Sequence, residues 1–173
     1  FLFETSYPLR KNNKNFVDYL TPILQLRYSP NKTKNIRNSD RRIDINNIYS
    51  FDRIGSSSTV EGGQSITLGG GYRRTDKNDN QLLGLDLATV FRDEINEDLP
   101  TKSTIGNKSS DIVGNFYLKP SKFFNFQYNF SLDNSLNRSN YDSVKTEFNV
   151  NNFVTTFEYL EENNLIGNES YIS

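Results

Sequence analysis

The sequence predicts an all-β fold in which about eight antiparallel strands, in meander order, form a curved open sheet that is part of a large transmembrane β-barrel. Three observations predict it. Apolar and polar residues alternate with period two, short polar turns alternate with long connections, and aromatic residues are frequent although mean hydropathy is low, at -0.70. A chain of 173 residues fits one domain, so we expect a partial outer-membrane barrel domain over residues 1–173.

The alternation is clearest over residues 124–132, where an aromatic or aliphatic residue occupies every second position. Successive side chains of a strand point to opposite faces, whereas a helix would mix the two sets around its circumference. A barrel strand needs an apolar face only toward lipid. The residues expected to face outward, on the convex side, are Phe124, Phe126, Tyr128 and Phe130, and those expected to face the lumen are Asn125, Gln127 and Asn129.

The same period recurs in further segments of roughly ten residues, the length that a tilted strand needs to cross a bilayer. The opening segment, about 1–10, is less regular but also predicts a strand. Helical period is weak everywhere, and the best helical candidate, 156–164, continues a strand pattern instead. The other alternating segments are 20–28, 66–72, 83–91, 112–119, 144–150 and 153–159.

The connections between these segments predict a barrel in a membrane. Short turns on one side and long loops on the other are typical of outer-membrane barrels, in which the short turns are periplasmic. A soluble barrel or sandwich has less reason to keep that rhythm. The short connections are expected near 11–15, 76–80, 120–122 and 149–152, and the long ones near 29–62, 93–110, 133–142 and 161–170.

The composition excludes several classes of protein. No His and no Cys are present, so a Ser-His-Asp triad, a disulfide and a thiolate metal site cannot form. A helical membrane protein would need about 18 consecutive apolar residues, and none of the segments approaches this. A net charge of -1 gives no global attraction to nucleic acid. We therefore expect no enzyme, no cofactor and no nucleic-acid partner. Because no Met is present and residue 1 lies inside an apolar run, we expect an internal fragment.

Two polar connections are candidate sites. Residues 40–63 mix charges with apolar residues and are too long for a turn, so they form either an ordered loop folded into the lumen or a solvated extracellular loop. The acidic cluster at Asp93, Glu94, Glu97 and Asp98 could hold a divalent cation through carboxylate oxygens, although a solvated charge run fits it better. We expect residues 40–62 to fold toward the concave side and predict no metal site.

Several short motifs together resemble the LPS-assembly outer-membrane protein family, also called organic-solvent-tolerance proteins. Residues 47–55, followed by 60–63, resemble a loop signature of that family; 110–114 resemble a strand opening, and 7–8 and 20–22 an early Tyr-Pro and Leu-x-Pro pattern. The order and spacing agree over roughly 7–160. Candidate site residues are those of the two main motifs: Asn47, Tyr49, Asp52, Arg53, Gly55, Glu61, Gly62, Ser110, Asp111 and Gly114.

The chain departs from the family pattern in three ways. Ile48-Tyr49 stands where Leu-Phe is usual, residues 56–59 replace a second Asp-Arg pair, and the family's cysteines are absent. The resemblance implies a large barrel of the Gram-negative outer membrane that receives lipopolysaccharide (LPS) from a periplasmic bridge and passes it to the outer leaflet through a lateral opening. It also implies a lipoprotein plug in the lumen. This chain would be the middle of the barrel, without the opening.

Other readings are a porin or nutrient receptor, a soluble carbohydrate-binding β-sandwich or adhesin, and an outer-membrane enzyme restricted to carboxylate or Ser chemistry. The motifs at 47–55 and 110–114 count against the first. For the sandwich, the discriminating observation is geometric, because two stacked sheets would bury the aromatic row of 124–130 between them. Eight strands could also close into a small barrel, with the first strand paired to the last.

Overall fold

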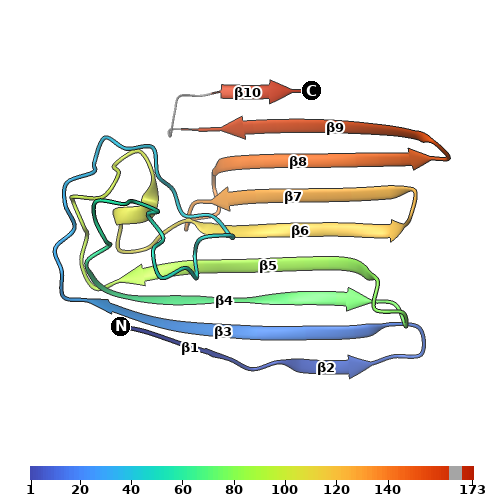
Figure 1. Cartoon of the computed structure of the whole chain (residues 1–173), viewed down its shortest axis with the longest axis horizontal. Coiled ribbons are helices and arrows are strands. Elements are labelled where there is room, and N and C mark those ends of the chain that lie inside the picture. The colour runs from blue at the N-terminus through green and yellow to red at the C-terminus, as the bar shows by residue number, and fades with distance from the viewer. Residues whose placement is uncertain (164–168) are drawn as a thin grey trace.

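The computed structural model describes residues 1–163 and 169–173, and the described strands form one antiparallel sheet (Figure 1). Strands that are consecutive in the chain are neighbours in the sheet, except that β1 and β2 both pair with β3. Within the described part, no strand pairing joins the two edges, so the sheet is open and the closed eight-strand alternative is not observed. The all-β meander prediction is confirmed. The strands are β1 (Leu2–Ser6), β2 (Leu9–Asn12), β3 (Val17–Ser29), β4 (Gly63–Thr75), β5 (Gln81–Arg92), β6 (Ile112–Ser121), β7 (Phe124–Leu132), β8 (Ser139–Val150), β9 (Phe153–Glu162) and β10 (Glu169–Ile172).

The sheet has ten strands where about eight were expected, and the difference lies at its edges. The opening segment is divided into β1 and β2 at Tyr7-Pro8. Proline has no N–H to donate to the ladder, so it interrupts the pairing there, while the Tyr7 N–H still donates to the Pro22 carbonyl at 3.1 Å. At the other edge, β10 forms part of what was expected to be a long connection, 161–170; residues 164–168 of that connection lie outside the described residues.

The connections lie at two opposite ends of the sheet (Figure 1). We call the end with the short connections the turn end and the opposite one the loop end. The short turns close tightly: the Asp76 carboxylate accepts N–H bonds from Asn78 and Asn80 at 2.8 and 3.0 Å, and Asp79 adopts a positive φ of 62°. The expected short-long rhythm holds for 30–62 and 93–111, whereas the connection expected to be long near 133–142 spans only 133–138, because β8 begins at Ser139. Turn-end connections are 13–16, 76–80, 122–123 and 151–152, and loop-end connections are 30–62, 93–111 and 133–138.

The two faces of the sheet differ in chemistry because the register keeps the apolar positions of neighbouring strands on one face and the polar positions on the other. Phe126 lies between Leu118 and Thr146 of the flanking strands, whereas Gln127, one position on, lies between Tyr117 and Lys145. We call the face that carries Phe126 the apolar face and the face that carries Gln127 the polar face. Large side chains remain exposed across the apolar face, with no second sheet stacked on them in the described residues; examples are Leu20, Leu26, Tyr28, Ile66, Leu68, Leu87, Phe91, Phe148 and Phe157.

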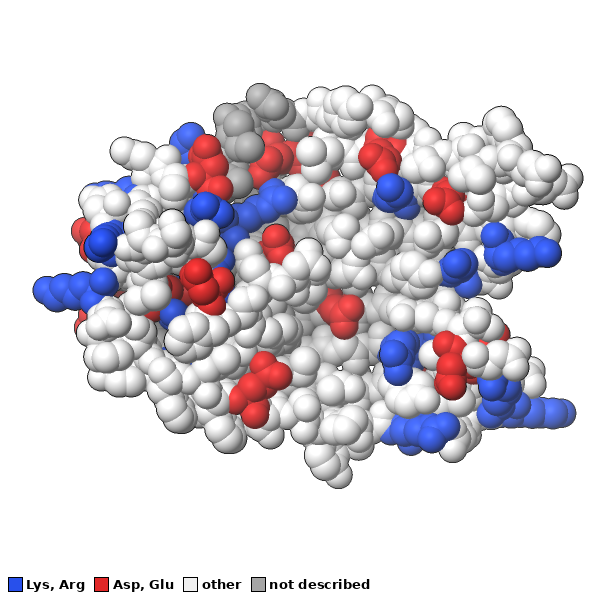
Figure 2. All heavy atoms as spheres, viewed as in Figure 1, with Lys and Arg blue, Asp and Glu red and all other residues white. Residues whose placement is uncertain are grey.

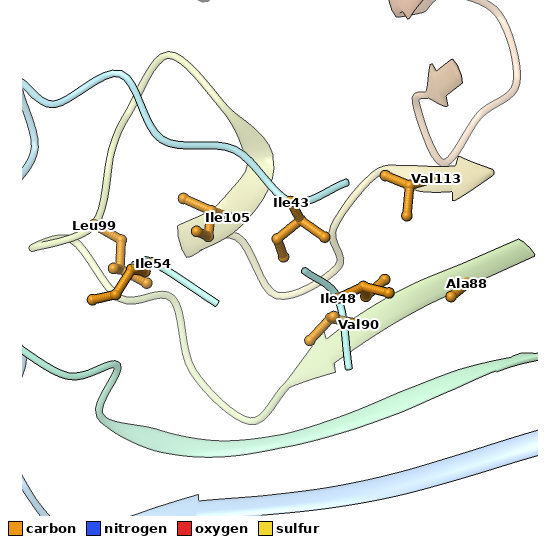
Figure 3. Close-up of a cluster of buried hydrophobic side chains, with 8 residues drawn as sticks. All are labelled: Ile43, Ile48, Ile54, Ala88, Val90, Leu99, Ile105 and Val113. Atoms are coloured by element: carbon orange, nitrogen blue, oxygen red, sulfur yellow. The ribbon is translucent and has the colours of Figure 1, made fainter. Parts of the chain in front are cut away.

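Two long connections fold over the polar face at the loop end and carry most of the hydrophobic core with them. Ile43, Ile48 and Ile54 come from 30–62 and meet apolar residues of β5 and of the 93–111 connection (Figure 3). Each fully buried Ile contributes roughly 2 kcal/mol, and this burial favours attachment of the segment to the sheet. Segment 40–62 is therefore an ordered loop on the polar face. The cluster is Ile43, Ile48, Ile54, Ala88, Val90, Leu99, Ile105 and Val113.

Candidate functional site

The polar face beneath the loops holds a buried cluster of one carboxylate and three guanidinium groups. Glu61 is 0 % exposed, and it lies near the end of the loop 30–62, just before β4. Arg53 from the same loop donates from Nε to Oε2 at 2.9 Å and from Nη2 to Oε1 at 2.6 Å. Arg27 of β3 lies 3.4 Å from Oε1, and Arg92 of β5 also donates to that oxygen. We call these four residues the Glu61 cluster.

Two guanidinium groups of the Glu61 cluster, those of Arg27 and Arg92, also bind the loop backbone. Arg27 donates to the carbonyls of Phe51 at 3.3 Å and of Glu61 at 2.8 Å, and Arg92 donates to the Ile105 carbonyl at 2.9 Å. Both long loops are therefore attached to the sheet by the arginines of β3 and β5. Burying a charge is unfavourable unless it is paired and hydrogen-bonded, and here each guanidinium has both kinds of partner.

Two opposing effects act on the pKa of Glu61. Burial by itself would raise it, because the charged form loses its hydration. The guanidinium groups of Arg92, Arg53 and Arg27 outweigh burial and hold the pKa below its ordinary value. Glu61 is therefore ionised at neutral pH, and its negative charge is what keeps the three arginines together.

The motif residues Asp52, Gly55 and Gly62 shape the loop backbone. The Asp52 carboxylate accepts the Gly55 N–H at 3.1 Å, and Gly55 has a positive φ of 54°, which glycine adopts without strain. A Cβ at Gly62 would overlap the Asn31 carbonyl oxygen, because the two ends of the loop cross there. The Gly62 N–H donates to Thr33 Oγ1 at 2.9 Å. These positions set the path that brings Arg53 to Glu61.

Asn47 and Tyr49 hold the middle of the same loop. Asn47 donates from Nδ2 to the Arg42 carbonyl at 2.9 Å and accepts the Asp44 N–H at 3.0 Å, which closes a turn. The Tyr49 carbonyl accepts a hydrogen bond from Gln25 Nε2 at 2.7 Å. The Tyr49 hydroxyl lies over Gly69, and a Cβ at position 69 would overlap that hydroxyl. Burial raises the pKa of the Tyr49 hydroxyl to about 12.

Ser110 and Asp111 attach the second long loop at the start of β6. Ser110 Oγ accepts the Val90 N–H at 2.9 Å, so it continues the ladder of β5 through a side chain. Asp111 accepts bonds from Ser131 Oγ at 2.8 Å and Asn140 Nδ2 at 2.9 Å, which connects the loop to the region of β7 and β8. Both residues are buried. Their arrangement is that of a structural anchor.

Gly114 belongs to the opposite face. It pairs with Phe130 in the register, and a Cβ at Gly114 would overlap the Phe130 ring. The missing side chain lets the Phe130 ring come close to the backbone of β6. The motif at 110–114 thus divides between the two faces: a side chain at position 114 would lie on the apolar face, while Gly114 itself lines a hollow beside Ile43 and Ile45 of the loop.

The expected lumenal amides all lie on the polar face, beyond the edge of the loop. Asn129 Oδ1 accepts a bond from Asn115 Nδ2 at 2.6 Å. With Gln127 and Asp86 they line a hollow of about 420 Å³ next to Tyr49. Asn125 lies farther toward the turn end, and its Oδ1 is buried without a partner among the described residues. The four aromatic residues from Phe124 to Phe130 share the apolar face, away from the loops.

Sequence reasoning missed Gln25, Arg27 and Arg92. Each occupies the polar face of a strand next to apolar neighbours, such as Leu26 beside both Gln25 and Arg27. The sequence feature that could have indicated them is a charged or amide side chain at a polar position of an alternating segment. That signal is shared by many solvent-facing residues, so it does not single these out.

The described residues contain no group of side chains arranged to hold a metal ion. No group of three acidic residues is close enough to hold a metal ion in that part of the chain, so the cluster at 93–98 forms no metal centre there. Nor is any helix of the described residues long and apolar enough to cross a membrane. The arrangement instead immobilises two loops over a polar sheet face.

Comparison with known protein families gives one match. The model of the family described as LPS transport system D matches residues 1–171. No curated protein matches the chain.

Proposed function

The chain belongs to the LPS transport system D family, and we propose that it forms part of the outer-membrane barrel that inserts LPS into the outer leaflet. The resemblance drawn from the sequence motifs is confirmed at the level of the family. Membership of this family supports a role in LPS transport at the outer membrane. Insertion into the outer leaflet is the more specific step that we propose.

The observation that carries the proposal is the opposite chemistry of the two sheet faces. The apolar face exposes residues such as Leu68 and Phe157 at 45 % each, which would be unfavourable in water and suits a lipid environment. The polar face carries amides, charges and the two loops. In a barrel that is open to water inside, these faces correspond to the lipid side and the lumen.

We propose that the polar face guides the hydrophilic part of LPS without covalent chemistry. Asn125, Gln127 and Asn129 present amide groups that can exchange hydrogen bonds with sugar hydroxyls. The loops immobilised by the Glu61 cluster narrow the lumen at the loop end. In outer-membrane barrels the short turns are periplasmic, so the loop end faces the cell exterior. The protein is then a transporter component and no enzyme.

The proposed partners follow from membership of the family. They are LPS itself, an outer-membrane lipoprotein that plugs the lumen, and periplasmic bridge proteins of the transport system. The sheet is open in the described residues, with β1 and β2 at one edge and β10 at the other. We propose that the parent barrel supplies further strands at these edges, since unpaired strand edges are not tolerated in a bilayer.

The proposal is tested with the full-length parent in a Gram-negative strain depleted of its own copy. The measurement is the fraction of newly made LPS that a non-permeant probe reaches at the cell surface. Depletion should leave new LPS inaccessible, and expression of the parent should restore access. Unchanged delivery of LPS during depletion would contradict the proposed function.

Cysteine labelling tests the assignment of the faces in the same protein. This chain has no Cys, so single substitutions give clean positions within it. Phe126→Cys should react with a membrane-soluble maleimide and resist a water-soluble one, and Gln127→Cys should react with the water-soluble reagent. The reverse pattern would exclude the proposed lipid and lumen sides.

A further inference from the structure

A row of side chains crosses the polar face near the turn end and contains two arginines without a carboxylate partner. Arg10 of β2 and Arg73 of β4 are the register neighbours of Tyr19 on β3, one on either side. Their guanidinium carbons lie 5.6 and 4.8 Å from the centre of the Tyr19 ring. Within the described residues neither forms an ion pair, and both are exposed.

The other arginines of the sheet behave differently. Arg27 and Arg92 pair with Glu61, and Arg74 pairs with Asp18 at 2.7 Å on the apolar side. Arg10 and Arg73 thus present guanidinium groups whose hydrogen-bond donors are free toward the lumen. The shared aromatic ring restricts both groups, because a cation near the face of a ring is stabilised there. Two guanidinium groups that share one aromatic ring and form no ion pair within the described residues favour an anionic ligand.

The neighbouring position leaves room for such a ligand. Gly84 of β5 is the register neighbour of Arg73 and adds no side chain of its own next to the guanidinium group. A Cβ at Gly84 would overlap Nε2 of Gln81, so the Gln81 carboxamide lies over the glycine beside Arg73. Figure 2 shows Lys and Arg groups at the turn end on both sides of a hollow in this face.

We propose that Arg10, Tyr19 and Arg73, with the Gln81 carboxamide, form a phosphate-binding platform that contacts the phosphate groups of LPS on its way into the lumen. Guanidinium groups bind phosphate through paired N–H donors, and a restricted guanidinium loses less entropy on binding. The inference rests on the proposed function for the identity of the ligand. The short turns mark the periplasmic end, so LPS arriving from the periplasm meets this row before it reaches the loops.

The test compares LPS with the same LPS after chemical removal of its phosphates, both bound to the full-length parent in detergent. Wild type should bind phosphorylated LPS on the order of tenfold more tightly, about the gain expected of a charge-assisted contact. The double variant Arg10→Gln/Arg73→Gln should lose that preference. The matched control, Lys14→Gln/Lys122→Gln, removes the same charge from exposed turn-end residues outside the row and should keep it.

Three outcomes would overturn the platform. Wild type could bind both forms of LPS equally, or the two double variants could lose the preference equally, which would indicate a general effect of charge. Phosphatidylglycerol vesicles could also compete as strongly as LPS, which would make a phospholipid headgroup the source of the phosphate.

A second measurement separates failure of the platform from failure of the proposed function. An arginine-selective reagent such as phenylglyoxal is applied to the parent with and without inorganic phosphate, and modification is quantified by mass spectrometry. Phosphate should slow modification at Arg10 and Arg73 and leave the exposed Arg138 unchanged. Protection here with no LPS binding would reject LPS transport but keep the anion site; equal rates at all three arginines would reject the site.

Discussion

Arg53 and Glu61 meet side by side, with two guanidinium N–H groups on the two carboxylate oxygens at 2.6 and 2.9 Å. Both residues belong to the loop between β3 and β4, eight positions apart, and both are fully buried. This paired geometry makes Glu61 the point at which the loop and the arginines of β3 and β5 come together.

Removal of the Glu61 charge should release the loop. In Glu61→Gln, three buried guanidinium groups lose the carboxylate that they share, and loss of one partner of a buried ion pair costs roughly 3–5 kcal/mol. The full-length parent should lose its compact form at a lower temperature, measured as heat-modifiable electrophoretic mobility. Glu94→Gln, at an exposed position of the other long loop, is the control and should leave that temperature unchanged. Equal behaviour of the two variants would contradict the role of the cluster.

Acid should weaken the same attachment. The pKa of Glu61 is lower in the folded state than its ordinary value of 4.5, so the ionised form stabilises the fold. That stabilisation is complete above the unfolded pKa and is lost as the pH falls through the folded pKa, below 4.5. Hydrogen exchange of residues 30–62 should rise as the pH falls in that range, after correction for intrinsic exchange rates. In Glu61→Gln the exchange should already be high and should depend little on pH; a parallel rise in both proteins would disprove the link.

Charge should be tolerated on one face of β7 and not on the other. Phe126→Arg places a guanidinium group on the apolar face, where a bilayer makes it unfavourable by roughly 2–4 kcal/mol at mid-depth. Gln127→Arg places the same group one residue on, on the polar face. The first variant should assemble poorly into membranes and the second near normally, measured as the folded fraction in outer-membrane preparations. Equal assembly of the two would argue against a lipid-facing apolar surface.

Ser110 should stabilise the fold because its hydroxyl accepts a hydrogen bond from the buried backbone N–H of Val90. Ser110→Ala leaves the buried Val90 N–H without its 2.9 Å acceptor, and an unpaired buried donor costs about 1–3 kcal/mol. The variant should lower the denaturant midpoint of the full-length parent. Ser109→Ala, at a partly exposed neighbour, provides the comparison and should change it little. A smaller effect at Ser110 than at Ser109 would exclude the anchoring role.

Much of this architecture was determined by the sequence alone. Alternation is a local property: Phe126 and Gln127 must point to opposite faces in any strand, whatever the strand pairs with. Strand length and the spacing of turns follow from the same local pattern, which is why β7 has the expected bounds, 124–132. The edge strands differed, because the interruption at Pro8 and the pairing of β10 depend on which neighbours are present. β8 also begins earlier than expected, at Ser139, where it pairs with Leu132 of β7.

The tertiary structure decided how the polar face is used. Glu61 meets Arg27 and Arg92 across 34 and 31 residues of chain, a contact that no local pattern encodes. The sequence left residues 40–62 either solvated or folded onto the sheet. In the structure this segment lies on the sheet, because Ile43, Ile48 and Ile54 are buried there. The physical reason is that side-chain direction follows from the backbone geometry of each residue, whereas ion pairing and loop packing require distant segments to meet, and only the register of the whole sheet sets where they do.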